Sequence, residues 1–163
     1  MVRKMSKDVG VINDLLVETF NDILQIEMKA LKKGVLNDLS ITEIHTIDAI
    51  GMYEYRTMTE VSQDLKITLG TLTTAINKLH KKGYVDRKRG EEDRRSVMIA
   101  LTRKGKIAYR IHDKFHSQMV QATINGLNSE EEEVLIKSLE KLNNFFKVEY
   151  KLEVNERGEL SNE

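Results

Sequence analysis

The stretch that decides the fold is residues 57–101, TMTEVSQDLKITLGTLTTAINKLHKKGYVDRKRGEEDRRSVMIAL. At its start, Thr57–Glu60 places a Thr three residues before a Glu, and this spacing lets the two side chains cap a helix N-terminus reciprocally. We predict a short helix there, a tight turn, and a second helix that is capped by Thr68 and ends near Gly83. Two short helices joined in this way are typical of a helix-turn-helix, although plain packing units can have the same form.

The residues after this helix pair predict a β-hairpin. Residues 84–89 and 96–101 are rich in strand-forming side chains, and residues 90–94 between them form a polar turn. A hairpin that follows a helix-turn-helix is a wing. We therefore expect residues 40–102 to form a winged helix-turn-helix lobe.

Amphipathic helical periodicity continues on both sides of this lobe. Ser40 and Glu43 predict the start of a helix that ends at Ile50, while residues 7–34 and 103–152 have the apolar spacing of long helices. The helix that follows the wing has a predicted apolar stripe of Ile107, Ile111, Phe115 and Met119. A last helix is predicted to begin at Asn128–Ser129, with Glu132 in its first turn. Its apolar stripe is Leu135, Leu139, Leu142 and Phe146, with Phe145 beside it. These helices are too apolar for one small lobe to cover, which predicts a twofold homodimer built on 7–34 and 103–152.

The whole chain of 163 residues is expected to form one mainly α domain. It contains no Pro and nine Gly, so few residues interrupt helices, and residues 153–163 are expected to form a flexible tail. With no Cys, disulfides and thiolate chemistry are excluded. No apolar run approaches 18 residues and no export signal is visible, so we expect a cytoplasmic protein without membrane association.

Enzyme motifs are absent from the sequence: there is no Gly-x-Ser-x-Gly, phosphate-binding loop or His-Glu-x-x-His. We expect no enzymatic activity and no cofactor. The net charge is zero, with 26 basic and 26 acidic residues, but residues 56–103 hold 11 basic and 6 acidic side chains. This excess of positive charge falls on the proposed winged lobe, where it would face phosphates of double-stranded DNA.

The candidate DNA-binding residues lie in the second helix of the pair and in the wing. Short polar side chains on the first turns of that helix can reach base edges, and free amides at its N-terminus can bind phosphate. The candidates are Thr68, Gly70, Thr71, Thr73, Thr74, Asn77, Lys78, Lys82, Arg87, Arg89, Asp93, Arg94 and Arg95.

The wing is the most specific sequence signal. Residues 92–97, EDRRSV, run into 101–105, LTRKG, and this composite resembles the acidic-x-Arg wing tip and Leu-Thr-x-x-Gly helix start of the MarR family of winged helix-turn-helix regulators. The resemblance covers about Leu15 to Leu152. It implies that Arg95 enters the minor groove, that Asp93 braces the wing, and that Arg94 is a neighbouring contact. Insertion of Arg into a narrow minor groove also has an electrostatic rationale.

Three further stretches, 44–48 (IHTID), 68–74 (TLGTLTT) and 112–116 (HDKFH), resemble the branch of that family that represses type II fatty acid synthesis genes. This resemblance implies a repressor whose co-repressor is a long-chain acyl-acyl carrier protein. Because carrier proteins are acidic, four basic side chains are candidate docking residues. They are Lys104, Lys106, Arg110 and Lys114.

Two alternative functions remain open, namely a MarR-type regulator that responds to zinc or to another small ligand, and an interaction module that does not bind DNA. His112 and His116 are four residues apart on one helix face, and His45 with Glu27 could complete a tetrahedral zinc site, as in zinc-responsive MarR regulators. The same histidines could instead pack and form hydrogen bonds near a hinge between lobes. A protein-interaction module that does not bind DNA could also use this fold.

Overall fold

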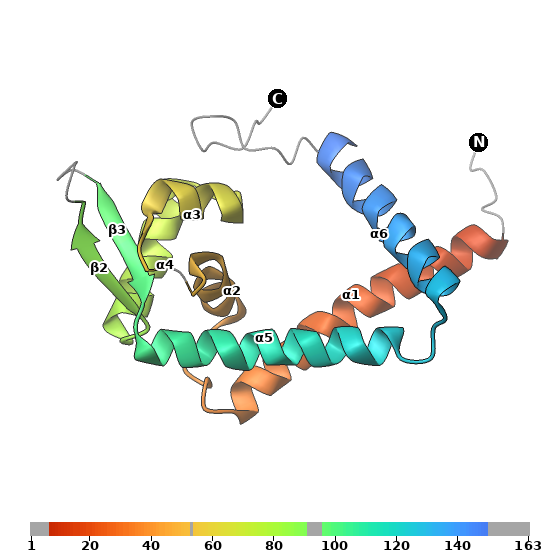
Figure 1. Cartoon of the computed structure of the whole chain (residues 1–163), viewed down its shortest axis with the longest axis horizontal. Helices are drawn as coiled ribbons and strands as arrows, with labels where there is room; N and C mark the ends of the chain where they lie inside the picture. The colour runs from red at the N-terminus through yellow and green to blue at the C-terminus, as the bar shows by residue number, and fades with distance from the viewer. Residues whose placement is uncertain (1–6, 53, 91–95, 150–163) are drawn as a thin grey trace. The chain divides into compact units, whose positions relative to one another are not determined.

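The computed structural model describes residues 7–52, 54–90 and 96–149. The chain divides into two compact units, one up to Ile41 and one from Thr42. In chain order the elements are α1 (Lys7–Lys33), α2 (Ile41–Ile50), β1 (Arg56–Thr57), α3 (Met58–Leu65), α4 (Leu69–Lys81), β2 (Val85–Arg89), β3 (Val97–Leu101), α5 (Arg103–Ile124) and α6 (Ser129–Glu149) (Figure 1). The predicted mainly α fold with a winged helix-turn-helix is confirmed. In the described ranges, no helix is long and apolar enough to cross a membrane.

The wing is part of a three-stranded antiparallel sheet with the strand order β1-β3-β2. In the hairpin, Val85 pairs with Leu101 and Arg89 pairs with Val97. The hairpin agrees with the sequence prediction, but the sequence did not predict β1. This two-residue strand pairs Arg56 with Ile99, and it places the start of α3 against the base of the wing.

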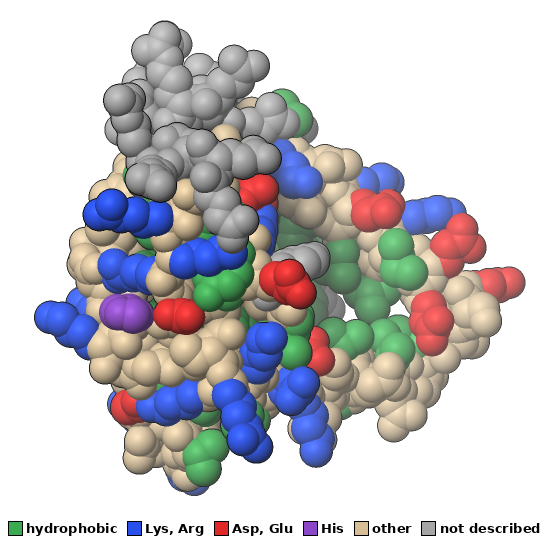
Figure 2. Space-filling model, turned by 60° about the vertical axis from the view of Figure 1, so that its left-hand side comes forward, with side chains coloured by type: hydrophobic (Ala, Val, Ile, Leu, Met, Phe, Trp, Pro, Cys, Tyr) green, Lys and Arg blue, Asp and Glu red, His purple; other side chains and the backbone are tan. Residues whose placement is uncertain are grey.

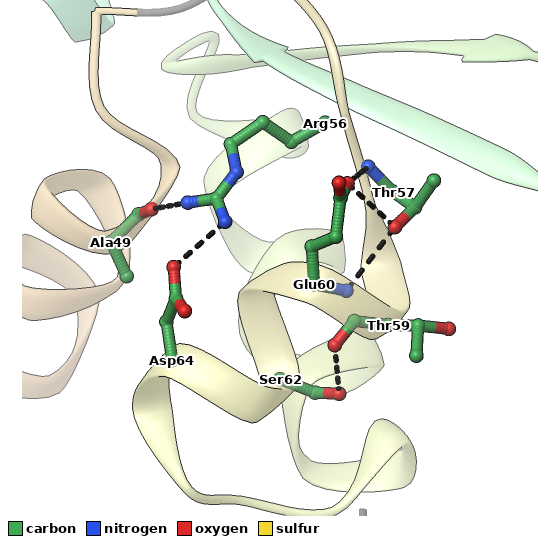
Figure 3. Close-up of polar contacts among 7 residues, drawn as sticks. All are labelled: Ala49, Arg56, Thr57, Thr59, Glu60, Ser62 and Asp64. Carbon is green, nitrogen blue, oxygen red and sulfur yellow. Dashed lines mark hydrogen bonds and ion pairs between the residues drawn. The ribbon is translucent and has the colours of Figure 1, made fainter. Parts of the chain in front are cut away.

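The first helix of the pair, α3, is held at its N-terminus by the predicted capping box (Figure 3). The Glu60 amide donates to the Thr57 hydroxyl at 3.1 Å, and the Thr57 amide donates to a Glu60 carboxylate oxygen at 2.7 Å. Arg56, just before the cap, donates to the carbonyl of Ala49 at the end of α2 and pairs with Asp64 in α3, both at 2.7 Å. Arg56 thereby joins the two helices that precede α4.

The core of the second unit lies between α2, α3, α4 and the sheet. Its side chains are aliphatic apart from one aromatic ring, as expected for the buried faces of amphipathic elements. Those less than 2 % exposed include Ile44, Ile47, Ile50, Val61, Leu72, Ile76, Leu79, Tyr84, Val85 and Ile99. The buried face of α4, the second helix of the pair, consists of Leu72, Ala75, Ile76 and Leu79.

The face of α5 that is buried against the lobe is not its predicted apolar stripe, which was assigned to the dimer interface. Its buried residues are Gly105, Ala108 and His112, whereas Ile107 is 46 % and Ile111 is 41 % exposed. The small side chains of Gly105 and Ala108 let α5 approach the sheet closely. The apolar stripe that the sequence predicted for this helix therefore does not form its contact with the lobe.

The cap of α6 is also shifted from the predicted one. The amides of Glu130 and Glu131 donate to the Asn128 side chain at 2.9 and 3.0 Å, and the carboxylate of Glu131, not Glu132, accepts from the Asn128 amide. In residues 129–149, all of which are described, no side chain is buried. The predicted tail, 153–163, lies outside the described residues.

Candidate nucleic-acid interface

The second helix of the pair, α4, presents a polar face without acidic side chains. Thr68 caps the helix, with its hydroxyl accepting from the Thr71 amide at 3.2 Å. Because the opposite face is buried, the predicted candidates between positions 68 and 78 lie together on the exposed side. These are Thr68, Gly70, Thr71, Thr73, Thr74, Asn77 and Lys78.

Gly70 leaves open space on this face. A Cβ atom built at Gly70 would meet only the Thr68 hydroxyl, at 3.8 Å, which is ordinary van der Waals contact. The fold of the protein itself therefore does not require a glycine there. Its missing side chain instead allows another molecule to approach the first turn of α4 closely.

Lys82, which the sequence placed near phosphate, has a partner inside the protein. Its ammonium group donates to both carboxylate oxygens of Glu43 in α2, at 2.8 and 2.7 Å. The Glu43 side chain is 7 % exposed and that of Lys82 is 32 % exposed. The pair fixes the C-terminal end of α4 to α2, and its positive charge is neutralised by a buried carboxylate. Charge counting along the sequence could not detect this, because the two residues are 39 positions apart.

The wing contributes two of the predicted arginines in the described residues, and both lie on β2. Arg89 is exposed, whereas Arg87 is partly buried and donates to the Asn77 side chain at 2.6 Å. The remaining predicted wing residues, Asp93, Arg94 and Arg95, lie outside the described residues. Figure 2, in which the side carrying β2 and β3 is turned forward, shows Lys and Arg side chains spread over this face with acidic side chains scattered among them.

Tyr55, which precedes β1, contacts two residues of β2. The Tyr55 hydroxyl donates to Asp86 at 3.1 Å, and the Lys88 ammonium lies 4.3 Å from the centre of the Tyr55 ring. The hydrogen bond to Asp86 raises the pKa of Tyr55 above its ordinary value. This aromatic ring, which the sequence analysis did not single out, orients a wing cation.

The four candidate docking residues all lie on α5, but they differ in their surroundings. Lys104 donates to the Lys82 carbonyl at 3.0 Å and lies 3.9 Å from the centre of the Tyr84 ring. Lys106 is half-buried, and Arg110 and Lys114 are exposed. Lys104 therefore helps to attach α5 to the end of α4.

Three predicted histidines meet between α2 and α5. His112 is 3 % exposed, its Nδ1 lies 2.6 Å from an Asp48 oxygen, and its Nε2 lies 3.1 Å from Nε2 of His116. The His45 ring centre is 5.7 Å from that of His112. The predicted fourth ligand, Glu27, lies on α1 in the other unit. Asp48, three residues after His45 on the same helix, was not among the predicted ligands.

Ligand atoms of Asp48, His112 and His116 all lie within 4.8 Å of one another. Nδ1 of His112 donates to the carboxylate, and the two Nε2 atoms share one hydrogen bond whose direction is set by the protonation of the two rings. The second Asp48 oxygen is buried and has no hydrogen-bond partner among the described residues. The cluster thus combines imidazole nitrogens with an unsatisfied carboxylate oxygen.

Comparison with known proteins is consistent with this fold. A family profile described as transcriptional regulator SarA/Rot matches residues 29–110, which is half of the chain. The organic hydroperoxide resistance transcriptional regulator of Bacillus subtilis is 32 % identical over 111 residues, covering 67 % of this chain and 72 % of that protein.

Two solved structures are similar over most of the chain. Streptococcus pneumoniae FabT in complex with DNA has 43 % sequence identity and a TM-score of 0.80, covering 85 % of this chain and 96 % of that one. A MarR protein from Peptoclostridium difficile has 27 % identity and a TM-score of 0.63, covering 91 % and 96 %. The resemblance found in the sequence is thus confirmed. The chain belongs to the SarA/Rot family of transcriptional regulators and has the winged-helix fold of MarR-type regulators.

Proposed function

We propose that this protein is a homodimeric repressor that binds double-stranded DNA sequence-specifically through α4 and the wing. The observation that carries the proposal is the 43 % identity to a protein solved on DNA, over 85 % of this chain. The polar face of α4, which carries no acidic side chain, fits a major groove, where short side chains can reach base edges. Arg89 and the wing arginines Arg94 and Arg95 would contact the backbone and the adjacent minor groove.

The exposed apolar side chains support the homodimer. On α1, Ile12 and Leu15 are each 57 % exposed, and on α6, Val134 and Leu139 are 64 % and 56 % exposed. Apolar faces of this extent on isolated helices are typical of subunit interfaces. A twofold dimer places its two recognition helices one helical turn of DNA apart, roughly 34 to 36 Å, and therefore requires a pseudo-palindromic operator.

We further propose that the regulated genes are those of type II fatty acid synthesis and that long-chain acyl-acyl carrier protein is the co-repressor. The likeness to FabT supports this identification. An acidic carrier protein would meet the cations of α5, of which Arg110 and Lys114 are exposed along the helix and Lys106 is half-buried. Lys104 would contribute less, because its ammonium already contacts Lys82 and Tyr84.

The test is fluorescence anisotropy with a duplex of the sequence bound in the Streptococcus pneumoniae FabT complex and with a scrambled duplex of equal composition. The full chain is measured alone and with palmitoleoyl-acyl carrier protein, with unacylated carrier protein as the matched control. Tightening by the acylated form on the specific duplex alone supports the lipid-synthesis repressor. Equal binding to both duplexes contradicts sequence-specific recognition, and absence of salt-sensitive binding to either one favours a DNA-silent interaction module.

A second candidate function, cation-responsive regulation, is favoured by the cluster of Asp48, His112 and His116. Two Nε2 atoms 3.1 Å apart can share one ion at the usual 2.0–2.1 Å zinc–nitrogen distance. Asp48 on the far nitrogen of His112 supplies the carboxylate–histidine arrangement that orients metal-binding imidazoles. Binding would displace the proton that now lies between the two Nε2 atoms.

The same anisotropy assay distinguishes this candidate, with zinc added alone and with a chelator. Zinc-dependent tightening that is lost in His116→Gln supports it. An unchanged affinity, together with no zinc uptake in equilibrium dialysis, contradicts it. The matched control is His80→Gln, which removes a histidine outside the cluster. His80 lies on α4, and its Nδ1 contacts the Val85 carbonyl at 2.8 Å.

A further inference from the structure

The exposed face of α4 has hydrogen-bonding groups that are already partly committed inside the protein. The Thr73 hydroxyl donates to the Leu69 carbonyl at 2.7 Å, and the Thr74 hydroxyl donates to the Gly70 carbonyl at 3.1 Å. A hydroxyl has a single proton to donate. Both threonines therefore offer only acceptor lone pairs and methyl groups to a molecule that docks on this face.

Asn77, one turn further along the same face, has the opposite polarity. Its side-chain oxygen accepts from Nη2 of Arg87 at 2.6 Å. A guanidinium group only donates hydrogen bonds, so the contacted atom must be the amide oxygen. The orientation of the amide is thus fixed by chemistry, and its NH₂ group is directed away from Arg87. Within the described residues this NH₂ group has no partner.

Arg87 is held by the fold. It lies in the middle of β2, where it pairs with Ile99 of β3, and its Nε atom is buried without a hydrogen-bond partner among the described residues. Together with Thr73 it lines a hollow of about 330 Å³ between α3, α4 and β3. The strand therefore places the guanidinium group beside Asn77, and it does not need DNA to do so.

This arrangement has a consequence for base recognition. An asparagine that is free to use both amide atoms reads adenine, because it donates to N7 and accepts from the N6 amino group. With Arg87 on the oxygen, a second donor such as the N6 amino group meets a cation and a competing donor. The major-groove edge of guanine presents two acceptors, O6 and N7, whereas cytosine presents a donor there.

We propose that Arg87 determines which base Asn77 reads, by holding the amide so that only its NH₂ group faces the major groove. In each half-site, the base that Asn77 contacts is then guanine in preference to adenine, and cytosine is rejected at that position. Arg87 acts here as a positioning residue, and Asn77 makes the base contact. The inference rests on the proposed function, since it requires α4 to lie in the major groove.

The experiment starts from the full-length protein and a library of randomised duplexes, from which the best-bound sequence is selected. Every single-base variant of that sequence is then measured by anisotropy at one salt concentration. Wild type should favour guanine over adenine about tenfold at one position in each half-site, the discrimination typical of a good base contact. Asn77→Ala should remove the preference at that same position and leave the others.

Arg87→Met supplies the decisive measurement. It frees the amide oxygen, so the preference at the position lost in Asn77→Ala should move from guanine toward adenine. The matched control is Arg89→Met, which removes the same charge from the same strand without touching Asn77. It should weaken binding to all variants alike. Asn77→Asp, a change at an exposed helix position, keeps the contact with Arg87 but replaces the donor by an acceptor, and should therefore favour cytosine.

The outcomes separate the inference from the proposed function. If Arg87→Met, like Arg89→Met, lowers affinity for all variants equally, Arg87 does not set the base preference and the inference is overturned. Wild-type preference for adenine at the position defined by Asn77→Ala overturns it as well. Should Arg87→Met fail to fold, the wild-type preference at the position defined by Asn77→Ala still decides, since guanine supports the inference and adenine overturns it. If wild type selects no sequence at all from the library, the proposed function has failed first.

Discussion

Replacing Lys82 by Met tests whether this residue stabilises the fold or binds phosphate. The substitution keeps the length of the side chain but removes the Lys82 ammonium from the Glu43 carboxylate, whose side chain is 7 % exposed. Removing one partner of a buried ion pair costs about 3–5 kcal/mol. Because the Lys82 side chain is 32 % exposed, solvent screens part of this interaction, and we expect a loss of about 2–3 kcal/mol.

The assay is urea unfolding at a fixed protein concentration, since association of subunits makes stability depend on concentration. With a slope of about 2–3 kcal/mol per M, the midpoint should fall by about 1 M. Lys81→Met is the matched control, because Lys81 is the exposed neighbour at the end of α4, and it should change stability by less than about 0.5 kcal/mol.

The double variant Glu43→Gln with Lys82→Met should recover at least half of the loss, because position 43 then no longer carries a buried negative charge that has lost its ammonium. The reasoning is refuted if Lys82→Met is as stable as Lys81→Met, or if the two single losses simply add in the double variant. If Lys82→Met keeps wild-type stability but flattens the salt dependence of DNA binding, Lys82 is a phosphate contact, as its place in the sequence suggested.

Three further predictions concern other parts of the winged lobe. Gly105→Ala should destabilise by about 3 kcal/mol in urea unfolding, because the new Cβ would lie 2.1 Å from the Tyr84 carbonyl oxygen and α5 would have to shift. Hydrogen bonds from the side chain and backbone of Thr57 lower the pKa of Glu60 below its ordinary value of 4.5, so their stabilisation is present above that pH and is lost as pH falls through the folded-state pKa. Glu60→Gln should therefore flatten the fall in stability below about pH 4.5, and an unchanged acid limb of the pH profile would contradict this. Arg95→Ala should weaken operator binding by about 1–3 kcal/mol in anisotropy titrations, and equal affinity in the two proteins would exclude the expected minor-groove contact.

Local sequence rules predicted the helices well, because capping depends on residues three positions apart. Thr57, Thr68 and Thr102 each accept a hydrogen bond from the amide three residues later. These side chains satisfy amides that a helix N-terminus leaves unpaired. The hairpin was predictable for a similar reason, since its two strands are joined by a short polar turn.

Contacts between distant residues could not be read in this way. The strand β1, only two residues long, has no periodicity to detect, and it forms because β3 offers it an edge. The apolar stripe of α5 was predicted from its periodicity, but periodicity does not say what covers such a stripe or which face of the helix contacts the lobe. The lobe contacts the small residues Gly105 and Ala108 instead, where helix and sheet can approach.

In the candidate site, too, local features were predictable from the sequence and contacts between distant residues were not. The polar face of α4 was predictable, since it is the side opposite a buried stripe. The partners of its cations were not, and net charge gave no hint that Lys82 is neutralised by Glu43 or that Arg87 is bonded to Asn77. Counting charge along a segment measures how many cations it contains, whereas binding depends on where each of them is held.

Helix α2 joins two of these distant contacts, and this arrangement makes a prediction about regulation. Asp48 contacts His112 of α5, and Glu43, five residues earlier on the same helix, holds Lys82 at the end of α4. An effector such as zinc that binds at the histidine cluster would act on α4 through α2, because both contacts influence the position of that helix. The variant Lys82→Met removes the contact between Glu43 and Lys82 and keeps the contact between Asp48 and His112.

The ratio of DNA affinities with and without effector should therefore fall toward one in Lys82→Met, while effector binding to the protein persists. The comparison is made in anisotropy titrations at a temperature where the variant is fully folded, with Lys81→Met as the control that keeps the link between α2 and α4. Because coupling free energies are reciprocal, the effector should also bind the variant equally well with and without DNA. A ratio that stays at its wild-type value in Lys82→Met would mean that the effector reaches α4 by a route that does not include Glu43.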